Sequence, residues 1–104
     1  MTIPYHKLVR DNIPAIIEAN GQTAKTRVLN DEDYTAALEK KLKEETREYL
    51  QSRDLTELAD ILEVVEALAK NQGADFEKLL TLKREKQAQN GAFDKRIYLV
   101  SVKK

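Results

Sequence analysis

Residues 43–50, KEETREYL, decide the fold expected of this chain, because they set glutamates into a segment whose apolar residues recur at helical spacing. Those apolar residues are Tyr34, Leu38, Leu42 and Tyr49. Steps of four, four and seven place all of them on one face of a helix. Glu45 falls in the middle of this face and Glu48 lies beside it. Acids are therefore expected where the helix should be buried.

A second segment, which contains TELAD at residues 56–60, repeats the pattern. Its apolar residues at helical spacing are Leu58, Ile61, Leu62, Val64, Val65, Leu68 and Ala69. Glu57 and Asp60 project into this apolar arc. Glu63 and Glu66 occupy the opposite face, where an amphipathic helix normally carries its charges. This helix therefore has two classes of acid, and only one of them belongs to an ordinary solvated face.

Glu45 with Glu48, and Glu57 with Asp60, have the i,i+3 spacing that makes two side chains neighbours on a helix. An unpaired buried carboxylate is destabilising, and like charges this close repel each other. No surplus of lysine or arginine shares these faces. A hard divalent cation such as Mg²⁺ prefers carboxylate oxygens and often bridges to phosphates. The four acids are therefore candidate ligands of Mg²⁺, held between two helices.

Two plainer interpretations remain open for these acids. Glu57 could be the partner of Asp54 in a capping box at the start of the second helix. The acids of KEETREYL could belong to a solvated face that also carries lysine and arginine. Neither interpretation accounts well for Glu45 or Asp60, which lie on apolar arcs.

The helical pattern predicts three main helices, over residues 33–52, 55–71 and 75–89. Residues that favour helix N-caps precede them, namely Asn30, Asp54 and Asp75. A short additional helix is expected near the N-terminus, because Asn12 and Pro14 form a start signal and Gly21 follows its end.

The expected fold is mainly α, a helical bundle that forms a single domain over residues 1–104. Two further segments, 24–29 and 96–102, predict a small two-stranded β element, because the second is rich in β-branched and aromatic residues.

Composition narrows the function classes. The 104 residues carry 18 basic and 18 acidic side chains, so the chain lacks the overall positive charge of a DNA- or RNA-binding protein. It has no cysteine, which excludes disulfides and thiolate metal sites. The N-terminal residues lack the apolar region of a signal peptide, and no apolar run has the length of a membrane span. A cytoplasmic protein without a membrane partner is the expectation.

KEETREYL followed by TELAD resembles the EExxE…ExxD signature of the MazG-like all-α nucleoside triphosphate pyrophosphohydrolases. The opening YHKLVRDNIPAIIEANG and the closing KREKQAQNGAFDKRIYLV resemble the phosphoribosyl-ATP pyrophosphohydrolase-like subgroup of that superfamily. Together these segments extend the resemblance over nearly the whole chain. Only eight residues separate Glu48 from Glu57, fewer than is usual in much of the family, so a tight turn between the two helices is expected.

The resemblance implies a MazG-like bundle and hydrolysis of a nucleotide between its α and β phosphates, giving a monophosphate and pyrophosphate. It implies Mg²⁺ as the cofactor, with Mn²⁺ as a substitute. The metal-binding acids of the family carry over onto Glu45, Glu48, Glu57 and Asp60. Glu44 would support them from a second layer or hold a second metal, and Glu44 or Glu45 could accept the proton of the attacking water.

Candidate substrate-binding cations lie near both ends of the chain. Lys83 and Arg84, near the end of the third main helix, suit phosphate, although basic residues also stabilise a helix C-terminus without any ligand. Lys7 and Arg10 in the N-terminal motif are further candidates. Arg10 could instead form a structural salt bridge with Asp11.

Apolar arcs on more than one side of the helices are hard to satisfy in one subunit, so a homodimer or a larger homo-oligomer is expected. Two other functions remain open. The chain could bind a nucleotide without cleaving it, or it could be a helical oligomerisation module. Neither the nucleotide nor the biological pathway follows from the sequence.

Overall fold

The computed structural model describes all residues, 1–104, and contains four helices and no β-strand. The helices are α1 (Ile13–Ala19), α2 (Asp31–Ser52), α3 (Leu55–Asn71) and α4 (Phe76–Asn90). The mainly α fold is thus confirmed, and each main helix begins and ends within two residues of its expected bounds. None of the four helices combines enough length with enough apolar character to cross a bilayer.

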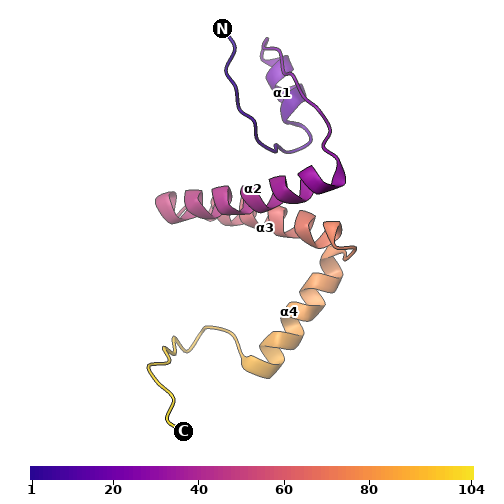
Figure 1. Cartoon of the computed structure of the whole chain (residues 1–104). Coiled ribbons are helices and arrows are strands. Elements are labelled where there is room, and N and C mark those ends of the chain that lie inside the picture. The colour runs from indigo at the N-terminus through magenta and orange to yellow at the C-terminus, as the bar shows by residue number, and fades with distance from the viewer.

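The centre of the molecule is an antiparallel hairpin of α2 and α3, which lie side by side in both views (Figure 1). Only Arg53 and Asp54 separate the two helices. Arg53 adopts a left-handed conformation (φ 58°), and its N–H donates to the Tyr49 carbonyl at 2.7 Å. The tight turn expected from the sequence is therefore present, and it returns the chain directly along α2.

Local capping signals fix where the main helices begin. The Asn30 side chain accepts from the Asp33 N–H, the Asp54 side chain from the Thr56 N–H, and the Asp75 side chain from the Lys78 N–H, at 2.8, 3.0 and 2.8 Å. Each bond satisfies an N–H group that has no partner inside its helix. The three expected caps are confirmed. At α1, Asn12 occupies the cap position but makes no such bond.

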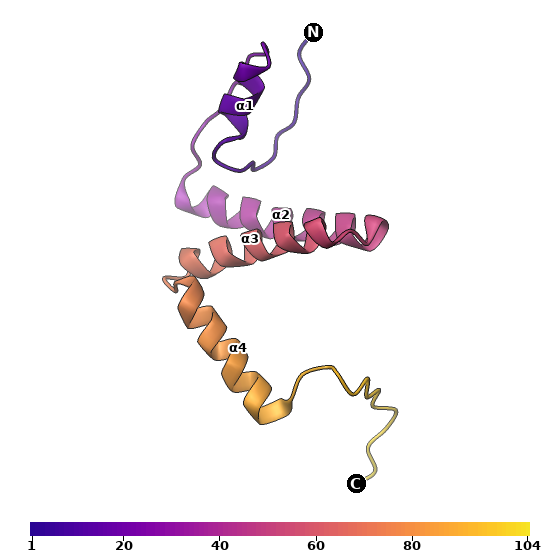
Figure 2. The same ribbon diagram turned by 180° about the vertical axis from the view of Figure 1, so that it is seen from behind.

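The peripheral elements diverge from this hairpin. α4 contacts α3 and no other helix, and it points away from the hairpin after the junction of the two helices (Figure 1). Figure 2 shows the N-terminal segment and α1 on the side of α2 opposite α4. The core is correspondingly small, because only Leu38, Glu45 and Val64 are buried. One of the three buried residues is thus an acid.

The single chain exposes far more surface than a compact protein of its length. Its solvent-accessible surface is 9783 Å², whereas about 5,900 Å² is expected for a compact monomer of this size. Its radius of gyration is 18.3 Å, against about 13 Å for a compact domain. Leucines of the central helices contribute, with Leu55 78% and Leu62 53% exposed. One chain therefore leaves large apolar surfaces without a neighbour.

The small β element expected from residues 24–29 and 96–102 is absent. Neither segment has a strand, and backbone hydrogen bonds do not join them. The C-terminal segment runs out beyond α4, on the opposite side of the hairpin from the N-terminal elements (Figure 1). Val28 and Val100 are 98% and 85% exposed. β propensity alone did not bring the two segments together, because a strand needs a partner for its backbone groups.

Leu38 is the most deeply buried residue of the hairpin, at 2% exposure, so truncating it should destabilise the fold. We expect Leu38→Ala to lower the free energy of unfolding by about 2–5 kcal/mol, because it removes apolar contacts and leaves a cavity. Leu38→Met keeps the volume and should cost less than about 1.5 kcal/mol. Urea denaturation followed by circular dichroism, at one protein concentration, measures both. Equal losses for the two variants would contradict the assignment of Leu38 to the core.

Candidate metal centre

The candidate site is centred on Glu45, which α2 directs toward α3. The residue is only 7% exposed, as its place on the apolar face of the helix predicted. Its oxygen Oε1 lies 3.3 Å from the Lys41 Nζ. Its other oxygen, Oε2, is buried and has no hydrogen-bond partner. A buried carboxylate oxygen without a partner is costly, and this one marks a place where a positive ligand would be favourable.

Carboxylates from both helices surround Glu45. One oxygen each from Glu45, Glu57 and Asp60 lie within 4.8 Å of one another. A second such group joins Glu45 to Glu44 and Glu48 on α2 itself. Glu45 belongs to both groups, so each of the other three acids predicted as metal ligands, Glu48, Glu57 and Asp60, lies near it. The donor set consists only of carboxylate oxygens, which suits Mg²⁺ or another hard divalent cation.

Burial raises the pKa of the Glu45 carboxyl above its usual value. The negative charges of Glu48 and Asp60 also raise this pKa, while the ammonium group of Lys41 acts in the opposite direction. The positive charge that the chain itself supplies is therefore insufficient to offset the burial and the acidic neighbours of Glu45. This electrostatic deficit is what a bound cation would remove.

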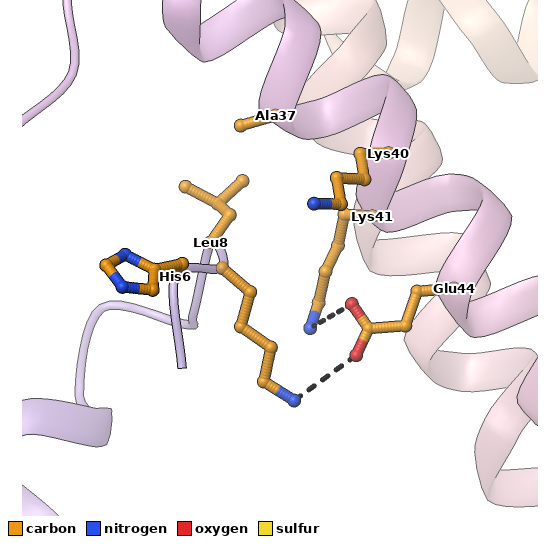
Figure 3. Close-up of a pocket in the computed structure, with 7 residues that line it drawn as sticks. His6, Leu8, Ala37, Lys40, Lys41 and Glu44 are labelled. Carbon is orange, nitrogen blue, oxygen red and sulfur yellow. Dashed lines mark hydrogen bonds and ion pairs between the residues drawn. The ribbon is translucent and has the colours of Figure 1, made fainter. Parts of the chain in front are cut away.

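Glu44 is in the opposite situation, because two lysines bind it. Lys7 Nζ from the N-terminal segment lies 3.2 Å from Glu44 Oε1, and Lys41 Nζ lies 3.4 Å from Glu44 Oε2 (Figure 3). Although partial burial acts to raise it, these two ammonium groups lower the pKa of Glu44 overall. Of the two acids named as candidate proton acceptors, Glu44 is thus the more weakly basic in this arrangement.

Arg10 connects the N-terminal segment to α3. Its two terminal nitrogens lie 2.8 Å from Asp60 Oδ1 and 3.2 Å from Glu63 Oε1. The alternative partner suggested by the sequence, Asp11, forms no ion pair with it. Because the three side chains are about half exposed, these pairs contribute little to stability. These ion pairs matter because they hold the Arg10 guanidinium group beside Asp60, one of the candidate metal ligands.

The capping-box interpretation of Glu57 is not supported by the hydrogen bonds. A capping box requires the Glu57 carboxylate to accept from the Asp54 N–H. That N–H instead donates to the Ser52 Oγ at 3.2 Å. The Glu57 carboxylate is therefore free to face Glu45 and Asp60.

Lys83 and Arg84 are not brought to the acids within one chain. Both are exposed residues of α4 that form no ion pair. α4 follows the C-terminal end of α3 (Figure 2). Glu57 and Asp60 instead lie in the first two turns of α3. Lys7 and Arg10, by contrast, both contact acids of the site.

Sequence reasoning missed the role of Lys41 as the partner that two acids share. It lies three and four residues before Glu44 and Glu45, so the helical i,i+3 and i,i+4 rule could have identified the contact. The ion pairs of Lys7 and Arg10 span 37 and 50–53 residues of sequence. No local signal predicts contacts across such separations.

Comparison with known proteins adds little to this geometry. A stretch of 42 residues is 52% identical to an uncharacterized protein of Mycolicibacterium smegmatis, and the match covers 40% of this chain and 43% of that protein. The alignment thus spans less than half of either protein. No protein-family model matches the chain, and no solved structure matches it.

The raised pKa of Glu45 predicts how a neutral substitute should behave without metal. Ionised Glu45 is less favourable in the folded than in the unfolded chain, so it destabilises the fold at pH values above its folded pKa. This effect disappears as the pH falls below the usual value for glutamate, about 4.3. We therefore expect Glu45→Gln to raise the melting temperature by a few degrees at pH 7 in EDTA, and by nothing near pH 4.

Thermal unfolding monitored by circular dichroism measures this difference at both pH values. Glu39→Gln is the matched control, because Glu39 lies on the same helix, is exposed and forms no ion pair. It should leave the melting temperature nearly unchanged at both pH values. A loss of stability in Glu45→Gln that is the same at pH 7 and pH 4 would disprove the electrostatic argument.

Proposed function

We propose that the protein is a Mg²⁺-dependent nucleotide pyrophosphohydrolase that cleaves a nucleoside triphosphate, or a related nucleotide, between its α and β phosphates. The observation that carries the proposal is the buried Glu45, which has one oxygen without a hydrogen-bond partner and lies among carboxylates from two helices. Carboxylates that converge in this way suit a divalent cation better than they suit a hydrophobic core. The motif resemblance to MazG-like enzymes supports the reaction class.

In this proposal Glu45, Glu48, Glu57 and Asp60 hold Mg²⁺, and Mn²⁺ can replace it. The cation supplies the positive charge that offsets both the acids and the phosphate oxygens of the substrate. The residues of the chain position the substrate and move the proton. Glu44 and Glu45 are the candidate proton acceptors; lysines bind both oxygens of Glu44, whereas Lys41 binds only one oxygen of Glu45.

Lys7 and Arg10 are the proposed substrate contacts nearest to the acids. Each is bound to an acid of the site, so each places its positive charge beside the acid cluster. A bound cation would offset part of the acidic charge of the site, and Lys7 and Arg10 would then be available to phosphate oxygens. Lysine and arginine both suit this role, as a point charge and as a planar fork.

The test of the reaction is pyrophosphate release from a panel of ribonucleotides, deoxyribonucleotides and damaged nucleotides, with and without Mg²⁺. Wild-type protein should release pyrophosphate from at least one of them only when Mg²⁺ is present. Glu48→Gln should reduce the rate at least about tenfold, because it removes one proposed ligand. The matched control is Glu39→Gln, an exposed acid of the same helix, which should keep the wild-type rate.

The other outcomes select the rival functions. Mg²⁺-dependent nucleotide binding without pyrophosphate release would identify a non-catalytic nucleotide-binding protein. A folded protein whose melting temperature responds to neither Mg²⁺ nor nucleotide would identify a helical oligomerisation module. Either result would end the hydrolase proposal.

We also propose that the protein works as a homodimer or a larger homo-oligomer. The single chain exposes about 3,900 Å² more surface than a compact monomer, and each partner of an obligate dimer typically buries about 1,000–2,500 Å². The exposed leucines of the hairpin and of α4, including Leu58 and Leu82 at 41% and 44% exposure, supply an apolar surface for such an interface.

Light scattering during size-exclusion chromatography should therefore give a mass of at least twice that of one chain. Leu62→Glu, which places a charge on the exposed apolar arc of α3, should shift the distribution toward smaller species. Glu39→Gln, which changes an exposed acid of α2 that forms no ion pair, should leave the distribution unchanged. A stable, compact wild-type monomer would contradict the proposal.

A further inference from the structure

A second feature lies next to the acid cluster. It is a groove of about 540 Å³ between the N-terminal segment and one face of α2. Four of its lining residues are cations, Lys7, Lys40, Lys43 and Arg47, and two are acids, Glu44 and Glu48. Because the chain as a whole is neutral, this excess of positive charge is local.

The cations that α2 contributes lack partners. Lys40, Lys43 and Arg47 are exposed and form neither an ion pair nor a side-chain hydrogen bond, whereas Lys7 is bound to Glu44. They follow one another at steps of three and four residues, so their side chains are neighbours on one face of the helix. Like charges at this spacing destabilise a helix. An anion bound between these three cations would offset their mutual repulsion.

The size and charge of the groove indicate the class of anion. Its volume falls in the range of small-molecule pockets, about 300–1,000 Å³. A row of cations along about two turns of helix suits a ligand with several negative charges in a line rather than a single carboxylate. The arginine fork and the lysine ammonium groups both match phosphate oxygens.

The groove also leads to the candidate metal centre. Glu44 and Glu48 line it, and both belong to the acid group that includes Glu45. A linear anion lying along Lys40, Lys43 and Arg47 would therefore lie alongside that acid group. The rim includes Tyr5, whose exposed ring already has the Lys7 ammonium group 5.9 Å from its centre.

We infer that this groove binds the polyphosphate chain of a nucleotide, with Lys40, Lys43 and Arg47 as the phosphate-binding residues. The identity of the ligand as a nucleotide rests on the proposed function, whereas the preference for a linear polyphosphate rests on the groove itself. These residues replace Lys83 and Arg84 of α4 as the proposed phosphate-binding cations, because Lys83 and Arg84 do not reach the acids within one chain.

The test is calorimetric titration of the full chain with inorganic tripolyphosphate in Mg²⁺-free buffer. The triple variant Lys40→Gln, Lys43→Gln, Arg47→Gln should bind at least about tenfold more weakly than wild type, because charge-assisted contacts to phosphate are lost. The matched control is Lys25→Gln, Lys78→Gln, Lys95→Gln, which removes the same charge from exposed positions outside the groove. This control should change the affinity less than about twofold.

Equal weakening in the two triple variants, or no tripolyphosphate binding by wild type, would overturn the inference. Lys43→Gln alone, at the middle of the row, should weaken binding measurably even if the triple variant is poorly folded. Unchanged affinity in that single variant and in the triple variant would also overturn it.

Pyrophosphate release by the same variants separates this inference from the proposed function. If tripolyphosphate binding depends on the groove while wild type hydrolyses no nucleotide, the binding site stands and the hydrolase proposal fails. If wild type hydrolyses a nucleotide and the groove variant does so with unchanged KM, the hydrolase proposal stands and the groove has no part in it.

Discussion

Glu45 lies where α2 packs on α3, and a carboxylate in that position must be compensated electrically. The hairpin buries only two apolar side chains with it, Leu38 and Val64, so the acid is part of the core rather than an addition to its edge. Lys41 compensates one oxygen and leaves the other without a partner. The proposed cation follows from this requirement, because Glu48 and Asp60 add to the negative charge around Glu45, whereas Lys7 and Arg10 pair with other acids.

The chain separates opposite charges although its net charge is zero. Acids gather between the two central helices, and unpaired cations gather on the face of α2 that borders the N-terminal segment. Glu44 belongs to both regions, and Lys7 binds it from the N-terminal side. A ligand that carries phosphates together with a divalent cation is complementary to both regions at once, which a ligand of one charge sign is not.

Local signals in the sequence predicted the helices and their caps, because a cap such as Asn30 or Asp75 needs only the next three residues. The burial of Glu45 was predicted for the same reason, since helical spacing alone puts it among Leu38, Leu42 and Tyr49. What the sequence could not predict depends on residues far apart. Arg10 binds Asp60, which lies 50 residues away in the sequence. Helical spacing alone assigns Lys43 and Arg47 to solvent. They border a groove only because the N-terminal segment crosses α2. The predicted β element is absent for the same reason, because the β propensity of a segment does not show which other segment it would pair with.

The length of the two-residue turn between α2 and α3 determines how the acids of the two helices face each other. Glu45 and Glu48 are fixed on one helix, Glu57 and Asp60 on the other, and only Arg53 and Asp54 set the phase between them. One inserted residue that extended α3 at its start would rotate its acids by about 100° relative to the rest of the chain. The turn between α3 and α4 carries no such constraint, because no acid of the cluster lies beyond it. Related chains would therefore be free to vary in length after α3, while the α2–α3 connection would tolerate substitution far better than insertion.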